Sequence, residues 1–392
     1  MVRDGLRLLV ALLVVVAGVG AVGTAGAAQS AVPGDTAAVA ESAAATNDAI
    51  AQENCSFPVT VEDAKGNEIT LDERPDSVVA LQPSAAQTMW EIGGQGQVTG
   101  MAVSRYTEYL DGRDNVTDIS QDDGVSVNVE TVVATEADLV LAPNSTPDET
   151  ISQVRNAGMT VYEFREAGSL DDIYEKTNRT GRLTGNCEGA AETVDRMQTE
   201  IRVVNEAVSG EDAAPLYYQM GGGYTPGEGT FINHIIELGG GENIAVAAGV
   251  EGYGQLSGEV IIEQNPEWIM VSRQMGLQES EALSGTTAVQ EDQVIEVNAN
   301  YLTQPGPRVV VPISQIAESI HPEAYEEANV SVRGEAEING SNSSGETTTT
   351  VENGGETDSD GDGESDSDGQ PGMGAGAAVA ALVAALALAG RR

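Results

Sequence analysis

The apolar and polar positions along the middle of the chain follow two alternating patterns. Short apolar runs, typical of buried strands, are separated by stretches whose apolar residues recur at helical spacing. The runs lie at 78–81, 98–103, 138–142 and 160–164, and again at 216–219, 268–272 and 294–298. Strands that alternate with helices predict an α/β fold with mainly parallel sheets.

A longer helical pattern separates the two series of runs. Its apolar residues recur at steps of three or four and share one face: Val194, Met197, Ile201, Val204 and Val208. We predict a helix over about 188–209, inside a connecting segment 186–210. At about 1.5 Å per residue such a helix is roughly 30 Å long, enough to link two lobes.

The second series repeats a unit of the first. VNVETVVATEADLVLA (127–142) aligns without a gap to LSGEVIIEQNPEWIMV (256–271), so that Glu130 falls on Glu259. We therefore predict two similar α/β lobes, at 55–185 and 211–332, with a ligand cleft at the carboxyl ends of their strands.

The loops at these strand ends contain the candidate ligand-binding residues. An aromatic ring with a polar tip suits the wall of a ligand site, and several tyrosines fall in these loops. The candidates are Ser84, Tyr106, Tyr109, Asn144, Arg165, Tyr224, Tyr253, Arg273 and Tyr301.

Both ends of the chain have the composition of targeting and linking segments. Basic residues precede the apolar run 8–22, and a small-residue cleavage site follows, so we read 1–28 as a signal peptide and 29–54 as a spacer. Residues 333–370 are rich in Thr, Ser, Gly and Asp and predict a solvated stalk. Residues 371–392 contain an apolar run just long enough to span a bilayer, followed by two arginines.

Charge restricts the partners of the protein. The 392 residues carry 62 Asp+Glu against 18 Lys+Arg, a formal net charge of −44. This charge repels nucleic acid, so we expect no DNA or RNA partner. The scarcity of lysine resembles the proteins of extreme halophiles, in which molar salt screens such repulsion over about 3 Å.

An exported protein is in an oxidising environment, in which two cysteines can form a disulfide and Asn-x-Ser/Thr triplets can be glycosylated. Cys55 and Cys187 are the two cysteines, and we predict a disulfide between them. The chain also has Asn-x-Ser/Thr triplets, which predict surface glycosylation. The candidates are Asn115, Asn144, Asn178 and Asn329, with further triplets at Asn54, Asn339 and Asn342.

The sequence lacks the common catalytic motifs. It has neither a Gly-x-Ser-x-Gly elbow nor a Ser-x-x-Lys motif, and its two histidines, His234 and His321, are far apart. We find no His/Cys/carboxylate grouping that predicts a metal site. We therefore expect a binding protein with no intrinsic cofactor. A surface adhesion or structural module remains an alternative, since the stalk and anchor suit it.

Four motifs in order resemble the ferric-siderophore and cobalamin binding proteins of ABC importers: RPDSVVALQPSAAQTMWEIGGQGQVTGMAVS, the two echoed segments, and GTFINHIIELGGGENI. The resemblance covers about 57–325 and implies two Rossmann-like lobes of the class III periplasmic-binding-protein fold. It also implies that Glu130 and Glu259 dock onto arginines of a permease, which works with ATPase subunits. We expect a monomer.

The ligand stays open between three classes. A ferric siderophore calls for cleft arginines, for which Arg105, Arg165, Arg273 and Arg308 are available. A cobalamin calls for aromatic walls, which the cleft tyrosines offer, and haem is a third possibility. The transported ligand would then contain Fe(III) or cobalt.

The carboxyl terminus resembles the PGF-CTERM sorting signal of archaeal surface proteins, with Met373 in place of the family's Phe. In that family an archaeosortase removes the tail and the protein is attached to a lipid. The resemblance implies an exported protein held at the outer face of the cytoplasmic membrane.

Overall fold

The computed structural model describes residues 55–343, with side-chain environments up to residue 334. The predicted signal peptide, spacer and anchor, and most of the stalk, lie outside these residues. In the described part no helix is both long and apolar enough to cross a membrane. The account below concerns the compact unit that ends at Gly340.

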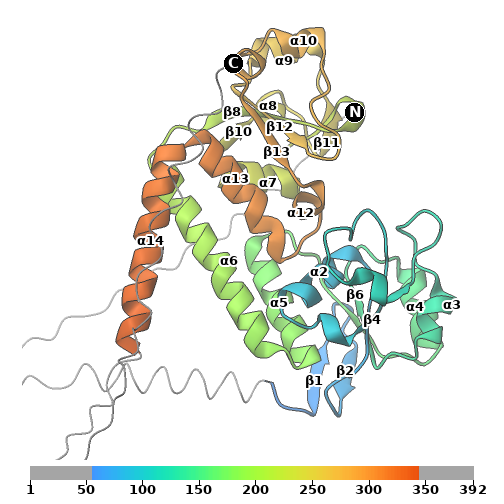
Figure 1. The fold of residues 1–392 in the computed structure, drawn as a ribbon. Helices are drawn as coiled ribbons and strands as arrows, with labels where there is room; N and C mark the ends of the chain where they lie inside the picture. Colours follow the sequence, from blue (N-terminus) through green and yellow to red (C-terminus); the bar gives the residue numbers. More distant parts are fainter. Residues whose placement is uncertain (1–54, 344–392) are drawn as a thin grey trace, which may run out of the picture. The chain divides into compact units, whose positions relative to one another are not determined.

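The N-terminal lobe is built on a five-stranded parallel sheet in the order β5-β4-β3-β6-β7 (Figure 1). The strands are β3 (Val78–Ala80), β4 (Val98–Met101), β5 (Thr117–Asp118), β6 (Leu139–Ala142) and β7 (Val161–Glu163). Its helices are α2 (Pro83–Glu91), α3 (Val129–Ala134), α4 (Asp148–Asn156) and α5 (Leu170–Thr184), with short turns η1 (Gln95–Gln97) and η2 (Arg113–Asn115).

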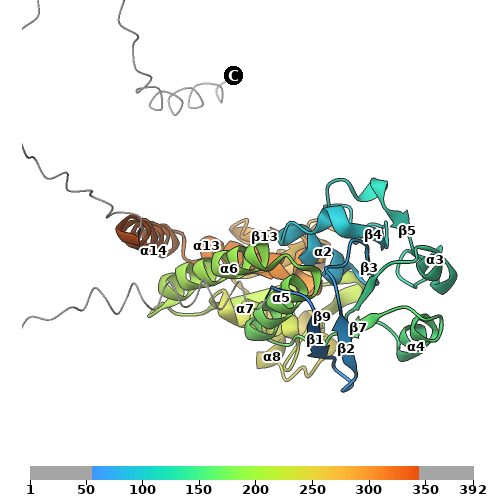
Figure 2. The same cartoon turned by 90° about the horizontal axis from the view of Figure 1, so that it is seen from below.

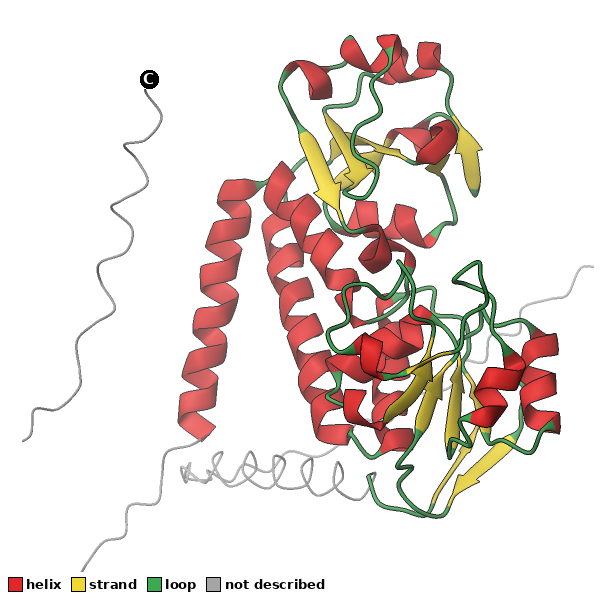
Figure 3. Cartoon of the chain, turned by 45° about the vertical axis from the view of Figure 1, so that its right-hand side comes forward, coloured by secondary structure: helices red, strands yellow, loops and turns green. Residues whose placement is uncertain are grey.

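Alternate residues of the central strands enter two separate cores. Leu139 and Leu141 of β6 pack with α2, whereas Val140 packs with α3 and α4 on the other face. The strands are therefore apolar on both sides, as expected for a parallel sheet covered by helices. Figure 3 shows the helices on either side of this sheet.

The C-terminal lobe has a four-stranded parallel sheet in the order β10-β8-β12-β13. The strands are β8 (Ala214–Gln219), β10 (Gly241–Asn243), β12 (Trp268–Ser272) and β13 (Val294–Val297), and a small antiparallel pair joins β9 (Tyr224–Pro226) to β11 (Tyr253–Gln255). The helical elements are η3 (Gly221–Gly223), α7 (Phe231–Leu238), α8 (Ile244–Ala247), α9 (Gly258–Gln264), α10 (Glu281–Ser284), α11 (Thr287–Gln290), α12 (Ala299–Thr303), η4 (Pro307–Val309), α13 (Val310–Ile320) and α14 (Pro322–Ser343).

The predicted linking helix is α6 (Cys187–Val208). Ala190 near its start packs in the core of the N-terminal lobe, and Met197 and Val204 pack in the core of the C-terminal lobe. Helix α5 lies beside α6 (Figures 1 and 2) and also reaches both cores, through Leu183 and Ile173. The two lobes are thus linked by a pair of packed helices, where the sequence predicted one.

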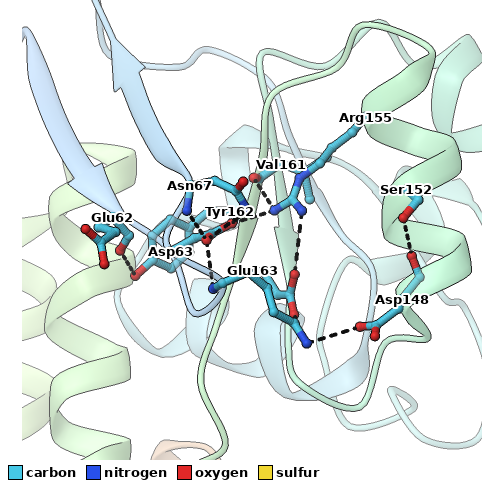
Figure 4. Close-up of polar contacts among 10 residues, drawn as sticks. Glu62, Asp63, Asn67, Asp148, Ser152, Arg155, Val161, Tyr162 and Glu163 are labelled. Atoms are coloured by element: carbon cyan, nitrogen blue, oxygen red, sulfur yellow. Dashed lines mark hydrogen bonds and ion pairs between the residues drawn. The ribbon is translucent and has the colours of Figure 1, made fainter.

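A hairpin of β1 (Val59–Glu62) and β2 (Glu68–Leu71) closes the outer side of the N-terminal lobe. Figure 4 shows its polar attachment, in which the Asp63 carboxylate and Glu163 both contact Arg155. Just before this hairpin, Cys55 forms the predicted disulfide with Cys187 at the start of α6.

Candidate functional site

The order of strands in each sheet determines where a ligand site can form. In the N-terminal lobe the chain runs outward from β3 to β4 and β5, then returns to β6 on the other side of β3. Loops that leave β3 and β6 at their carboxyl ends therefore diverge, which opens a crevice at this switch point. In the C-terminal lobe the same reversal occurs between β8 and β12.

A cavity of about 470 Å³ occupies the crevice of the N-terminal lobe. Its wall is formed by the segments after all five strands of this sheet, by α5, and by the end of α12 and the residues after it from the other lobe. The lining residues are Gln82, Pro83, Ser84, Tyr106, Val125, Asn144, Ser145, Arg165, Ala167, Lys176, Thr303, Gln304 and Pro305. Its volume is within the range of small-molecule sites.

Four of the predicted ligand-binding residues meet in this cavity: Ser84, Tyr106, Asn144 and Arg165. Ser84 is buried at the start of α2, which begins with Pro83 at its first helical position, where the missing N–H costs nothing. Arg165 is largely exposed, and its guanidinium pairs with Glu175 at 2.6 Å. The Tyr106 hydroxyl accepts a hydrogen bond of 2.6 Å from Arg105.

Sequence reasoning missed the buried cation of this cavity, Lys176. Its Nζ donates hydrogen bonds to Ser84 Oγ at 3.0 Å and to the Pro305 carbonyl at 2.8 Å. Burial, which disfavours the charged form, lowers the pKa of Lys176 to about 7. The residue lies inside a helix with no motif around it. The one available signal was that Lys65 and Lys176 are the only lysines of the chain.

Tyr109 and Tyr301, also predicted to bind ligand, contact each other between the two lobes and do not line the cavity. Their rings meet edge to face at 5.1 Å. The Tyr109 hydroxyl donates to Gln304 Oε1 at 2.6 Å and accepts from Gln87 at 2.8 Å. Burial raises the pKa of Tyr109, so this hydroxyl stays neutral.

Arg308 completes this contact between the lobes. Its guanidinium lies over both rings, 5.0 Å from the centre of the Tyr109 ring and 5.3 Å from that of Tyr301. It also pairs with Glu91 of α2 at 2.6 Å. These bonds hold the lobes together beside the cavity, and with α5 and α6 they favour a rigid arrangement.

The remaining candidates, Tyr224, Tyr253 and Arg273, lie on the C-terminal lobe outside the cavity. Tyr224 and Tyr253 are on the paired strands β9 and β11, with 48% and 55% of their surface exposed. Tyr224 follows β8, and Tyr253 precedes the unit of α9 and β12. Both therefore lie near the switch point of this sheet. Met275 is also exposed, and its methyl group lies close to Gly221, three residues before Tyr224.

A second, more open groove of about 1130 Å³ adjoins the cavity and shares Gln82, Val125 and Ser145 with it. Its wall includes Glu130 and three further acidic residues: Asp122, Asp123 and Glu149.

The two predicted docking glutamates occupy equivalent positions. Glu130 is the second residue of α3 and Glu259 the second residue of α9, and both are exposed. A side chain caps each helix just before them: Asn128 accepts from the Thr131 N–H, and Ser257 accepts from the Val260 N–H. Each cap fixes the first turn and so displays the carboxylate in the same way on each lobe.

Two roles predicted for Asn144 exclude each other, because the residue lines the cavity. A glycan there would occupy the space of the ligand. Asn115 and Asn178 are exposed and Asn329 is partly exposed, away from the cavity. Asn54, Asn339 and Asn342 lie outside the residues whose side chains are described. Between residues 55 and 334, no cluster of His, Cys, Asp and Glu suited to a metal ion is present.

Known proteins similar to this chain were found by sequence and by structure. The model of the family described as "Periplasmic binding protein" matches residues 78–301. A cobalamin-binding protein of Halobacterium salinarum (strain ATCC 29341 / DSM 671 / R1) is 42% identical over 279 residues, covering 68% of this chain and 75% of that protein.

Two solved structures share the fold. The periplasmic vitamin B12 binding protein of Vibrio cholerae has a TM-score of 0.54 at 21% identity, covering 65% of this chain and 98% of that one. The periplasmic heme-binding protein of Roseiflexus sp. RS-1, in its apo form, has a TM-score of 0.55 at 21% identity, covering 65% and 99%. At this identity both similarities show the fold alone.

Proposed function

This chain belongs to the periplasmic binding protein family, a non-enzymatic family, and we propose that it is the substrate-binding component of an ABC importer for a cobalamin-type corrinoid. The 42% identical relative, named as a cobalamin-binding protein, carries this proposal. It favours a corrinoid over a ferric siderophore. Haem is supported only through structures of about 20% identity, which share the fold.

The size and chemistry of the site support the proposal of such a ligand. A corrinoid is larger than most small-molecule ligands, and the cavity continues into the second groove through Gln82, Val125 and Ser145. Polar groups of the N-terminal lobe face the cavity, and the exposed rings of Tyr224 and Tyr253 offer apolar contact from the other lobe. The ligand would lie between the carboxyl ends of the two sheets.

Quenching of tryptophan fluorescence tests the proposal. Trp90 lies in α2 and Trp268 in β12, so each lobe holds one tryptophan. We expect cobalamin, titrated into the full chain in molar KCl, to quench this fluorescence saturably. A ferric siderophore or haemin at the same concentrations should compete weakly. Saturable binding of haemin or siderophore without binding of cobalamin would contradict the proposal.

We further propose that Glu130 and Glu259 dock this protein onto its permease. Both carboxylates are exposed at the second position of a capped helix on lobes that α5 and α6 join stiffly. Two carboxylates held at a constant separation can pair with two arginines of a partner and set its orientation.

An exported, membrane-anchored protein of high-salt surroundings is the setting that we propose for this function. The apolar run of 8–22 supports export, the tail of 371–392 supports anchoring, and the net charge of −44 supports molar salt. Mass spectrometry of the protein from its native host tests the two ends. We expect a mature chain that starts near residue 29, ends before the apolar run of 371–392 and carries a lipid.

A further inference from the structure

The cavity wall contains a positive charge that has no counter-ion. Lys176 is 8% exposed, and its two hydrogen-bond acceptors, Ser84 Oγ and the Pro305 carbonyl, are both neutral. No carboxylate pairs with it in the part of the chain that the structure describes. Burial of an unpaired ammonium group is unfavourable, and the cost is offset when an anion binds to it.

The other lysine of the chain shows the usual arrangement. Lys65 is about half exposed and pairs with Asp148 at 3.4 Å and with Glu163 at 3.5 Å, two residues labelled in Figure 4. In a chain with 62 acidic residues, a carboxylate partner for a lysine is easily available. Its absence at Lys176 is therefore a specific feature of the cavity.

The geometry leaves Lys176 able to bind an anion. An ammonium group has three N–H donors, and two of them are used by Ser84 and Pro305. No third hydrogen-bond acceptor is present among the described residues; Nζ lies 5.8 Å from the centre of the Phe164 ring, and Lys176 lines the 470 Å³ cavity. Arg165 lines the same cavity, but Glu175 already neutralises its charge.

We propose that Lys176 recognises an anionic group of the ligand, namely the phosphodiester in the nucleotide loop of a complete cobalamin. This inference rests on the proposed function and goes beyond it, because it assigns the residue that distinguishes complete cobalamins from cobinamide. Cobinamide has the same corrin ring but lacks the nucleotide loop and its phosphodiester.

The proposal implies a pH dependence of binding. The pKa of Lys176 is about 7 in the free protein, so the ammonium form is lost as pH rises through this value. A bound anion stabilises the ammonium form. The affinity for cobalamin should therefore be at its maximum below pH 7 and should fall as the pH rises above 7.

Charged groups also face Lys176 from the segment after β7 and from α5, and the pKa of Asp172 among them is lowered by a hydrogen bond from Ser169. They are Arg165 and Glu166 after β7, and Asp172, Glu175 and Arg179 on α5. The contacts from α2 and from the segment after α12 are the neutral ones of Ser84 and Pro305. A fall in affinity between pH 7 and 8.5 would thus report Lys176.

The test compares two ligands on three variants of the full chain: Lys176→Met, Lys176→Arg and the control Lys65→Met. Calorimetric titration in molar KCl measures the affinity for cobalamin and for cobinamide. We expect Lys176→Met to lower cobalamin affinity about tenfold to a hundredfold, the range for a hydrogen bond to a charged group. Cobinamide affinity should change less than about twofold, since it makes no such bond.

The controls separate charge from folding. Lys176→Arg keeps the positive charge and should retain the preference for cobalamin, whereas Lys65→Met should leave both affinities unchanged. Equal losses of both ligands in Lys176→Met, or a flat pH profile of cobalamin binding by the unaltered chain, would overturn the inference. If circular dichroism shows that Lys176→Met is unfolded, the pH profile and Lys176→Arg decide.

Failure of the proposed function would look different. In that case the unaltered chain would bind neither cobalamin nor cobinamide at any pH. If it binds both equally well, the chain is a corrinoid-binding protein in which Lys176 has no role in recognition.

Discussion

The echoed units of the two lobes fold alike down to single residues. Aligned without a gap, Val140 of β6 falls on Ile269 of β12. Val140 packs on the side of its sheet covered by α3 and α4, and Ile269 packs on the side of its sheet covered by α9. Glu136 falls on Asn265, and both have positive φ, 50° and 42°, in the turn between helix and strand. Such backbone is uncommon outside glycine, so its recurrence marks one shared unit.

The residues around the ligand cavity show no such correspondence. The N-terminal lobe contributes most of the cavity wall, including the ammonium group of Lys176. The C-terminal lobe contributes Thr303, Gln304 and Pro305, and exposes Tyr224 and Tyr253 nearby. The comparison teaches that the packing and the two capped glutamates are repeated in both lobes, whereas the residues that line the 470 Å³ cavity are not.

The largest expected effect concerns the paired glutamates. Charge reversal of both, Glu130→Lys with Glu259→Lys, should abolish cobalamin uptake because two attractive contacts with the permease become repulsive. Ligand affinity should not change in Glu259→Lys alone, since Glu259 lines neither the 470 Å³ cavity nor the adjoining groove, whereas Glu130 lines the groove. Growth on limiting cobalamin measures uptake, and undiminished growth would refute the docking role. The single variants show whether the lobes contribute equally.

The next largest expected effect concerns the exposed aromatic rings of the C-terminal lobe. Tyr224→Ala with Tyr253→Ala should lower cobalamin affinity by about tenfold or more, because two rings lose contact with the ligand. Both rings are about half exposed, so the melting temperature should stay nearly unchanged. Fluorescence titration measures the affinity. Unaltered affinity would confine the ligand to the N-terminal lobe.

Equivalent core positions should have similar effects on stability. Leu141 and Met270 are aligned in the echo, and both are fully buried. Leu141→Ala and Met270→Ala should each lower the free energy of unfolding by about 2–5 kcal/mol. Chemical denaturation in molar KCl gives both values. A large difference would show that the two cores tolerate cavities differently.

The smallest effect is at Asp138 and its aligned partner Glu267. Hydrogen bonds from Ser77 and the Asp76 N–H hold the pKa of Asp138 below its usual value, whereas the structure gives Glu267 no such bonds. Asp138→Asn should lower the free energy of unfolding by about 1 kcal/mol at pH 7, and Glu267→Gln by nearly nothing.

The pH dependence of the Asp138 effect has a definite sign. A lowered carboxylate pKa adds stability above the unfolded pKa of about 3.9, and this contribution is lost as pH falls through the native pKa. Denaturation curves of Asp138→Asn and the unaltered chain should therefore converge once the pH falls below the native pKa of Asp138. A difference that persists at low pH would point to a packing effect.

Much of the scaffold was predictable because it depends on local apolar periodicity. The predicted strands at 268–272 and 78–81 match β12 and β3 within a residue, and α6 begins one residue before the predicted helix. The hairpin of β1 and β2 was missed, since its alternation is short and ends at a polar turn. Helix α5 was missed because its buried face consists mostly of threonines, with Lys176 and Gly181, and contains few large apolar residues.

The sequence by itself determined the two α/β series, their echoed glutamates and the paired cysteines, because each is recorded in local spacing or in a short motif. Only the tertiary structure decided which loop residues share a cavity. It brought Ser84, Lys176 and Pro305 together from three distant segments, and it placed Tyr109 and Tyr301 in a contact between the lobes. Such contacts depend on strand order and lobe packing, and neither leaves a periodic signal in the sequence.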